Sequence, residues 1–392
     1  MKMNRYKLGD ICEIVSGSTP KTSIEEYWDG NVKWITPAEL DNDSYIITDT
    51  VRKITDLAVK KTGLSSFPEG TVILSSRAPI GKVAIAGCEM YCNQGFKNLI
   101  CSNKINNKYL YWFLKGNTEL LNSLGRGATF KEISKQIVAS IEINVPDYDR
   151  QIEIVEHLER INEIIKLRRQ ELVILDELIK ARFVELFGDP IHSDKFGYVR
   201  VETCVADKND MVDGPFGSQV DTKIDYIENG EIPVIRTVNV KMMQFSPLDL
   251  KFMTREKYNA VIRSQVLPGD VILTKVGTIG NVCIFPEDYD EAVLSTTGSC
   301  RIRVDESKMN KVFFAYNLMY LKPRLLEIAS AGVQPFLNMK HVKNIEVLNA
   351  PMEQQEQFVT FVHQVDKSKV AVQAALEKVQ LLFDSLMQEY FG

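Results

Sequence analysis

The sequence has little of the chemistry that marks a metal site, a disulfide scaffold or a membrane span. Its seven cysteines are scattered, with no C-x-x-C pair, and its four histidines form no cluster with ligand spacing. This pattern excludes a recognisable zinc site and is typical of reduced thiols. No run approaches the ~20 apolar residues that span a bilayer, and residues 1–10 lack the apolar core of a secretory signal. We therefore expect a cytoplasmic protein.

The sequence also lacks an excess of positive charge. Lys and Arg number 47 against 52 Asp and Glu, for a net charge of −5. A protein that held nucleic acid by general electrostatics alone would usually be basic, so a simple polycationic binder is excluded. The acidic residues are densest in 148–188 and 351–392, whereas 1–147 carries a small positive excess. We expect the two acidic segments to contact protein rather than DNA.

The motifs of common catalytic and cofactor sites are missing too. A P-loop cannot be placed before Gly81-Lys82, because Ser76 stands where the first glycine is needed and Val83 where Ser or Thr is needed. No G-x-G-x-x-G follows a predicted strand, and neither H-E-x-x-H nor G-x-S-x-G occurs. The sequence therefore predicts a chain without catalytic residues, metal or cofactor of its own.

What the sequence does contain is a repeat with a period near 200 residues. The matching stretches are 32–36 with 232–236, 70–84 with 269–283, Asn107-Lys108 with Asn310-Lys311, and 138–188 with 342–392. The offset grows smoothly along the chain from 199 or 200 to 203 and then 204. This period is far too long for a solenoid and indicates a duplicated module.

The end of each copy has the pattern of a long helix. Apolar residues recur at alternating gaps of three and four, which is a coiled-coil seam interrupted at Arg168 and Arg182. Pro146 and Pro351 precede the two helices, and Gly188 followed by Pro190 predicts the end of the first. The predicted seam is Ile154, Leu158, Ile161, Ile165, Leu172, Leu175, Ile179, Leu186, Phe358, Val362, Val365, Val372, Leu376, Val379, Phe383 and Leu386.

So continuous an apolar stripe must be buried, and the other copy of the helix is a suitable partner. We expect the two helices to pair as an antiparallel coiled coil with pseudo-twofold symmetry. The alternative is that each helix packs only on its own globular part.

The globular parts have the pattern of mixed α/β (α+β) modules, present in two copies. Residues 72–74 and 271–273 are short β-rich runs between Gly and Pro signals, whereas 109–114 and 312–316 are apolar stretches compatible with buried helices. The predicted organisation is module 1 (residues 1–147), a helix (148–188), module 2 (residues 189–350) and a second helix (351–392).

Polar and basic residues gather in the Gly/Pro loops of both modules. Arg, Asn and Gln can bond base edges, and Lys, Ser and Thr suit phosphates, although such residues are also ordinary in surface loops. Trp28, Trp34 and Trp112 are better explained as core residues than as base-stacking platforms. The candidate DNA contacts are Lys21, Thr36, Ser76, Arg77, Lys82, Asn93, Gln94, Lys97, Arg126, Thr129, Lys131, Ser218, Arg236, Asn239, Lys275, Thr278, Asn281, Thr296, Thr297 and Gln334.

Two modules, each followed by a heptad helix, resemble the specificity subunit of type I restriction–modification enzymes. The matching motifs are Gly17-Ser-Thr-Pro20, Trp34-Ile35, Ile73-Leu-Ser-Ser-Arg-Ala-Pro-Ile-Gly-Lys82, Asn93-Gln-Gly95, Pro146 with Gln151-x-x-Ile-Val155, and Pro351 with Gln355-x-x-Phe-Val359. Three features depart from the family pattern. Arg150 and Gln354 replace a usual Glu, Val276 stands opposite Arg77, and module 2 lacks a clear N-Q-G.

The resemblance implies a function. Each module would be a target recognition domain that reads one half of a bipartite site in double-stranded DNA, and the helices would set the gap between the halves. The chain would recruit two methylation subunits and the restriction–translocation subunits, which would carry S-adenosylmethionine, ATP and Mg²⁺. The alternative, from another class, is a coiled-coil scaffold or adaptor without DNA binding.

Overall fold

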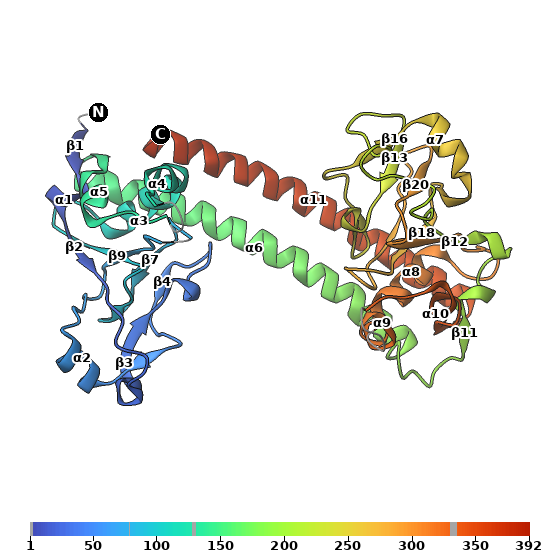
Figure 1. The fold of residues 1–392 in the computed structure, drawn as a ribbon, viewed down its shortest axis with the longest axis horizontal. Coiled ribbons are helices and arrows are strands. Elements are labelled where there is room, and N and C mark those ends of the chain that lie inside the picture. The colour runs from blue at the N-terminus through green and yellow to red at the C-terminus, as the bar shows by residue number, and fades with distance from the viewer. Residues whose placement is uncertain (1–2, 78, 128–130, 330–334) are drawn as a thin grey trace. The chain divides into compact units, whose positions relative to one another are not determined.

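The computed structural model describes residues 3–77, 79–127, 131–329 and 335–392 (Figure 1). The chain divides into two compact units, Met1–Gln170 with Gln373–Gly392, and Glu171–Val372. Each unit therefore combines one globular module with one half of each long helix.

The first unit begins with a mixed α/β module. Its elements are β1 (Asn4–Lys7), α1 (Leu8–Ile11), β2 (Cys12–Ser16), β3 (Trp28–Ile35), β4 (Ile46–Ile47), β5 (Lys53–Ile54), α2 (Asp56–Thr62), β6 (Val72–Leu74), β7 (Val83–Ala86), β8 (Tyr91–Cys92), β9 (Lys97–Cys101), α3 (Asn107–Gly116), α4 (Thr118–Leu124), α5 (Lys135–Ser140) and β10 (Glu142–Val145). The main sheet has the order β2-β9-β6-β7-β4, a smaller one the order β5-β3-β8, and β1 pairs with β10.

The core of this module lies between the main sheet and α3. All three side chains of β6 are buried, which is why a run of Val, Ile and Leu forms a strand here. Helix α3 is capped by Asn106, whose side chain accepts hydrogen bonds from the backbone of Lys108 and Tyr109. Residues Tyr109–Leu114 of this helix are all buried. The predicted strand at 72–74 and the predicted buried helix at 109–114 are confirmed. Trp34 and Trp112 are core residues.

The second unit contains the other module. Its elements are β11 (Tyr198–Arg200), β12 (Met211–Asp213), β13 (Ile232–Ile235), β14 (Val240–Lys241), β15 (Gln244–Phe245), β16 (Lys251–Met253), α7 (Arg255–Ala260), β17 (Gln265–Val266), β18 (Val271–Thr274), β19 (Val282–Ile284), β20 (Ala292–Leu294), β21 (Ser299–Ile302), α8 (Lys311–Tyr320), α9 (Lys322–Ala329), α10 (Met339–Lys343) and β22 (Glu346–Leu348). Its sheets have the orders β12-β21-β18-β19 and β16-β13-β20-β17, with the pairs β14-β15 and β11-β22.

Two 40-residue helices follow the modules, α6 (Tyr148–Phe187) and α11 (Met352–Phe391). After α6, Gly188 has a φ of 80° and donates its backbone N–H to the Val184 carbonyl. This left-handed residue ends the helix at the predicted position.

Within the second unit, the halves of the two helices run antiparallel. Lys369 lies 2.6 Å from Asp176, and farther along α6 the ring of Phe183 lies 5.4 Å from that of Phe358. Residue numbers rise along α6 while they fall along α11, which is the antiparallel direction. The end of α6 also enters the core of module 2, because Phe187 packs on Phe313 of α8 at 4.7 Å.

Within the first unit, the first half of α6 and the last part of α11 share one hydrophobic core with module 1. The ring of Phe383 in α11 lies 5.6 Å from Trp112, and Phe391 lies 5.1 Å from Tyr109. The Arg150 guanidinium of α6 lies 5.9 Å from the Tyr390 ring. In both units, therefore, the helix halves pack on each other and on a module. The expected pairing is confirmed, and the alternative in which each helix packs only on its own globular part is wrong.

Every residue of the predicted seam is buried or half-buried. The heptad pattern missed Phe183 and Phe187, which are fully buried and lie at the centre of an aromatic cluster. It missed them because each lies one residue after a position of the heptad pattern, Arg182 or Leu186, on a face of α6 that contacts both Phe358 of α11 and Phe313 of module 2.

The fold class predicted from the sequence is confirmed: two mixed α/β modules, each followed by a long helix that pairs with the other. One detail of the repeat is wrong by one residue. Asn310 caps α8 as Asn106 caps α3, so the partner of Asn310 is Asn106 rather than Asn107. Among the described residues, no helix has the length and apolar composition needed to cross a membrane.

Candidate nucleic-acid interface

Four loop segments of module 1 meet at one end of its main sheet; we call residues 17–21, 75–77, 93–97 and 131–133 loop cluster 1. The backbone N–H of Ser18 donates to the Cys92 carbonyl at 3.0 Å, and the Thr19 hydroxyl donates to the side chain of Gln94. Ser76 donates its N–H to Gly95 at 2.7 Å and accepts from Ile133 at 2.9 Å. These bonds hold together segments that are far apart in the sequence.

Module 2 has a matching arrangement, loop cluster 2, formed by residues 213–218, 274–278, 295–298 and 335–337. The backbone N–H of Lys275 donates to Gly298 at 2.8 Å, and the Lys275 carbonyl accepts from Leu337 at 3.0 Å. These are the bonds that Ser76 makes with Gly95 and Ile133. Hence Lys275 corresponds to Ser76, and the tripeptide Thr296-Thr297-Gly298 corresponds to Asn93-Gln94-Gly95.

This correspondence explains why module 2 lacked a recognisable N-Q-G in its sequence. The glycine is kept because its carbonyl bonds the neighbouring loop, while the two side chains before it differ. Thr297 has a φ of 46°, in the left-handed region that β-branched residues rarely adopt. Such strain is typical of functional loops.

A glycine permits the close approach of the first loop in each cluster. A Cβ added to Gly17 would overlap the backbone oxygens of Cys92 and Asn93, and one added to Gly214 would overlap the backbone oxygen of Ser295. Both glycines therefore fix how near the first loop comes to the segment that ends in Gly95 or Gly298.

An ion-pair cluster joins three of the four segments of loop cluster 1. The Glu132 carboxylate lies 2.9 Å from Arg77 and 3.3 Å from the ammonium of Lys97, whose side chain is 8% exposed. Burial of Glu132 raises the pKa of its carboxyl, but hydrogen bonds from Arg77 and Lys97 outweigh this, so the pKa lies below its ordinary value of 4.5. The carboxylate therefore stays ionised and holds both cations.

Loop cluster 2 has a buried ion pair built from different positions. Lys275, with a side chain 5% exposed, pairs with Asp213 at the end of β12. From the strand register, Asp213 corresponds to Ser16, and Cys300 takes the place of Lys97. Each module thus has a paired lysine and carboxylate in its loop cluster, and the residues that form the pair are not equivalent in the two modules.

The candidate contacts divide by exposure. Those that present exposed side chains are Lys21, Arg77, Gln94, Arg126, Lys131, Ser218, Thr278 and Thr297. Those that are half-buried are Thr36, Lys82, Asn93, Arg236 and Thr296, and those that are buried are Ser76, Lys97, Asn239, Lys275 and Asn281. Thr129 and Gln334 lie outside the described residues.

The less exposed candidates are engaged within the protein. Asn239 donates to the carbonyls of Ser246 and Leu248, and Asn281 donates to Val240 while accepting from Lys322. Lys82 donates to the Leu40 carbonyl, Thr36 bonds Glu39, and Arg236 pairs with Asp249 at 2.8 Å. The exposed candidates are therefore the ones available to a ligand.

Sequence reasoning overlooked two exposed apolar residues in loop cluster 2. Val276 and Phe336 are bridged as antiparallel neighbours, at the positions that Arg77 and Glu132 occupy in module 1. The alignment of Val276 with Arg77 was visible in the sequence, but its pairing with Phe336 was not, because the two residues are 60 positions apart.

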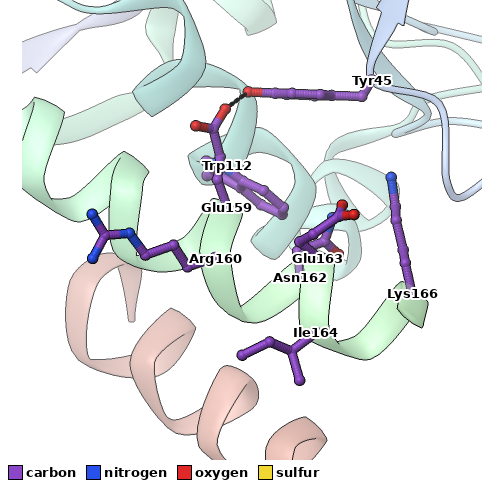
Figure 2. A pocket seen from close by; sticks show the side chains of 8 residues that line it. All are labelled: Tyr45, Trp112, Glu159, Arg160, Asn162, Glu163, Ile164 and Lys166. Atoms are coloured by element: carbon purple, nitrogen blue, oxygen red, sulfur yellow. Dashed lines mark hydrogen bonds between the residues drawn. The ribbon is translucent and has the colours of Figure 1, made fainter. Parts of the chain in front are cut away.

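A separate hollow lies along the first half of α6 (Figure 2). It is lined by Tyr45, Trp112, Glu159, Arg160, Asn162, Glu163, Ile164 and Lys166. The Tyr45 hydroxyl donates to the Glu159 carboxylate, which also lies 2.9 Å from Lys108. Burial and this bond raise the pKa of Tyr45 above its ordinary value. The hollow contains none of the candidate DNA contacts.

Within the described parts of the chain, no group of three or more His, Cys, Asp or Glu could hold a metal ion.

Comparisons with known proteins agree with this architecture. The family model described as "Type I restriction modification DNA specificity domain" matches residues 2–175 and 216–380. The MjaIX type I restriction enzyme specificity subunit of Methanocaldococcus jannaschii is 29% identical, with 97% of this chain and 90% of that protein covered. The MjaVIII specificity subunit of the same organism is 21% identical, with 96% and 90% covered.

Solved structures share the fold. The S subunit of the type I restriction–modification system from M. genitalium matches with a TM-score of 0.57 at 15% identity, with 100% of this chain and 96% of that chain covered. A chain from a structure concerning complex assembly and conformational transition of the type I R-M system matches with a TM-score of 0.63 at 16% identity, with 99% and 97% covered. The family match spans both modules, and the chain belongs to the type I restriction modification DNA specificity family.

Proposed function

We propose that the chain reads a bipartite site in double-stranded DNA, with module 1 on one half-site and module 2 on the other. The observation that carries this proposal is the pair of loop clusters. Loops of different sequence are held by the same backbone hydrogen bonds, which suits two readers with a common frame and different targets. Base edges are read by side chains placed in this way on a rigid support.

In loop cluster 1 the exposed Arg77 and Gln94 are suited to base edges, and Lys21 and Lys131 to phosphates or bases. The exposed Arg126, which is a bridge neighbour of Glu132, is suited to the same contacts. Arg77 is oriented by Glu132, so its guanidinium loses little freedom on binding. In loop cluster 2 the exposed candidates are the hydroxyls of Ser218, Thr278 and Thr297. Selectivity would come from these local groups, since neither module has a large positive excess.

The paired helices would set the gap between the half-sites. Each contains 40 residues, which corresponds to about 60 Å at 1.5 Å per residue. A change in the length of this helix pair should alter only the gap between the half-sites. In dimeric DNA-binding proteins, likewise, the spacing of the half-sites follows the geometry of the protein.

The helices would also recruit partner subunits. Outside its buried seam, α6 exposes Ile164 and Leu167 in the first unit and Val173, Ile174 and Leu178 in the second. A second apolar stripe on a helix suits partner helices. We propose that two methylation subunits bind this stripe and that the restriction–translocation subunits join the complex outside them. S-adenosylmethionine, ATP and Mg²⁺ would belong to these partners, while this chain would be non-catalytic and act in the cytoplasm.

The decisive experiment is to co-express the chain with its methylation subunit and to map modified adenines. A gapped motif with two defined halves is the expected result. No sequence-specific modification by a folded, assembled complex would overturn DNA reading and favour a coiled-coil scaffold or adaptor.

Two changes to the chain then separate the modules from the spacer. Exchange of residues 1–147 for the corresponding module of another family member should change one half-site only. Equal insertions of one heptad in α6 and α11 should widen the gap and keep both half-sites. Altered half-sites at a fixed gap would contradict the spacer role.

A further inference from the structure

Loop cluster 2 presents an apolar pair to solvent. Val276 is 43% exposed and Phe336 is 47% exposed, and the two residues are antiparallel bridge partners. The neighbouring bond from Leu337 N–H to the Lys275 carbonyl, 3.0 Å long, fixes the backbone of both. A large aromatic side chain that a bonded backbone holds in contact with water has an unfavourable hydration free energy, which a bound apolar group would relieve.

The same backbone site in module 1 is ionic. There Arg77 and Glu132 are the bridge partners, and they form an ion pair of 2.9 Å. In module 2, Lys275, the residue before Val276, is instead buried and paired with Asp213. The surface of loop cluster 2 is therefore apolar at the position where that of loop cluster 1 is charged.

The surroundings of the pair indicate what would cover it. Gly277, next to Val276, has a φ of 72° and open space around it, so the loop tip is accessible. The exposed hydroxyls of Thr278 and Thr297 belong to the same cluster. Hydroxyls suit phosphates and base edges, and the apolar group that double-stranded DNA offers in its major groove is the 5-methyl group of thymine.

We propose that Val276 and Phe336 contact thymine methyl groups in the half-site that module 2 reads. This inference rests on the proposed DNA-reading function and specifies its chemistry. A half-site that is methylated on adenine contains at least one A·T pair, so a thymine is present. The contact would distinguish T·A from C·G by the methyl group, without a bidentate hydrogen bond.

The test uses the complex of this chain with its methylation subunits, bound to duplexes that carry the mapped site. Thymines of one half-site at a time are replaced by deoxyuridine, which removes the 5-methyl group and keeps the base pairing. Dissociation constants are measured at fixed salt for the native complex and for Val276→Ser/Phe336→Ser. Ile262→Ser, an exposed apolar residue of the same unit outside the loop cluster, is the matched control.

For the native complex, deoxyuridine in the half-site of module 2 should weaken binding about fourfold for each methyl group that is covered. The double variant should bind the thymine and deoxyuridine duplexes equally, whereas Ile262→Ser should keep the native ratio. A native complex that is indifferent to deoxyuridine there, or a double variant that keeps the native ratio, would overturn the apolar contact. Failure of the native complex to prefer its mapped site over unrelated DNA would instead overturn the DNA-reading function.

Discussion

The side-chain oxygen of Gln151 lies 2.7 Å from the backbone nitrogen of Asn106, and Gln355 makes the same bond to Asn310 at 2.9 Å. Each glutamine is 1% exposed and stands in the first turn of its long helix. Each asparagine caps the buried helix of the preceding module. The pair ties the start of a long helix to its module, which gives a physical reason for the repetition of this glutamine.

Gln151→Ala should therefore be costly. Besides Asn106, the Gln151 amide bonds the carbonyls of Lys104 and Pro146. The substitution removes all three hydrogen bonds, of which the one to Pro146 is buried. We expect a loss of about 2–4 kcal/mol in the free energy of unfolding, measured by urea denaturation. Gln170→Ala, on an exposed part of the same helix, should change it by less than about 0.5 kcal/mol. Equal effects of the two substitutions would contradict the role assigned to Gln151.

Phe183→Ala tests the packing of α6 on its partner helix and on module 2. The ring contacts Phe358 of α11 and Phe313 of α8 and is fully buried. Its removal should cost about 3–5 kcal/mol. Val184→Ala alters the neighbouring exposed residue and should cost little. Thermal and urea unfolding of the two variants provide the comparison, and a mild effect of Phe183→Ala would mean that α6 is not anchored there.

The sequence allowed prediction of the features whose signals are local or periodic. Such features are the heptads of α6 and α11, the end of α6 at Gly188 and the short apolar strands. Each depends on residues that are near one another in the sequence, so its pattern can be recognised there. The register of the repeat was misjudged at Asn107 because two asparagines are adjacent and only Asn106 has the capping bonds.

The loop clusters could not be derived in the same way. Lys97 pairs with Glu132 in one module and Lys275 with Asp213 in the other, so the ion pair is kept while its positions are exchanged. No alignment of the two copies reveals this, because equivalent residues do not carry equivalent charges. Burial of single residues in these loops was also not visible in the sequence. Asn239 and Lys275, for example, are candidate contacts from Gly/Pro loops that are buried and bonded within the protein.

Gly214→Ala tests the geometry of loop cluster 2. An added Cβ would overlap the Ser295 carbonyl, so the first loop must move away from the segment that ends in Gly298. We expect at least a tenfold loss of affinity for the mapped DNA site, with assembly with the methylation subunit retained. Gly217→Ala lies in the same loop, where a Cβ meets open space, and should bind nearly as the native chain does. Equal affinities of the two variants, measured by fluorescence anisotropy, would show that the close approach does not matter.

Glu132→Gln tests the ion-pair cluster within loop cluster 1. The pKa of Glu132 is lower in the folded protein than its ordinary value of 4.5, so ionisation of the carboxyl favours the folded state. This contribution is fully present above pH 4.5 and is lost as the pH falls through the lower, folded pKa. The substitution should cost about 1–3 kcal/mol at pH 7, because the buried Lys97 loses its counter-charge.

The difference between native protein and Glu132→Gln should shrink as the pH is lowered below 4.5, whereas Glu89→Gln, at an exposed position of the same module, should differ little from the native protein at any pH. Urea unfolding at several pH values measures both. In addition, loss of the Glu132 carboxylate frees Arg77, so binding to the half-site of module 1 should weaken while deoxyuridine discrimination in the other half-site is unchanged. A difference in stability that is constant with pH would mean that the carboxylate is not the group that holds Lys97 and Arg77.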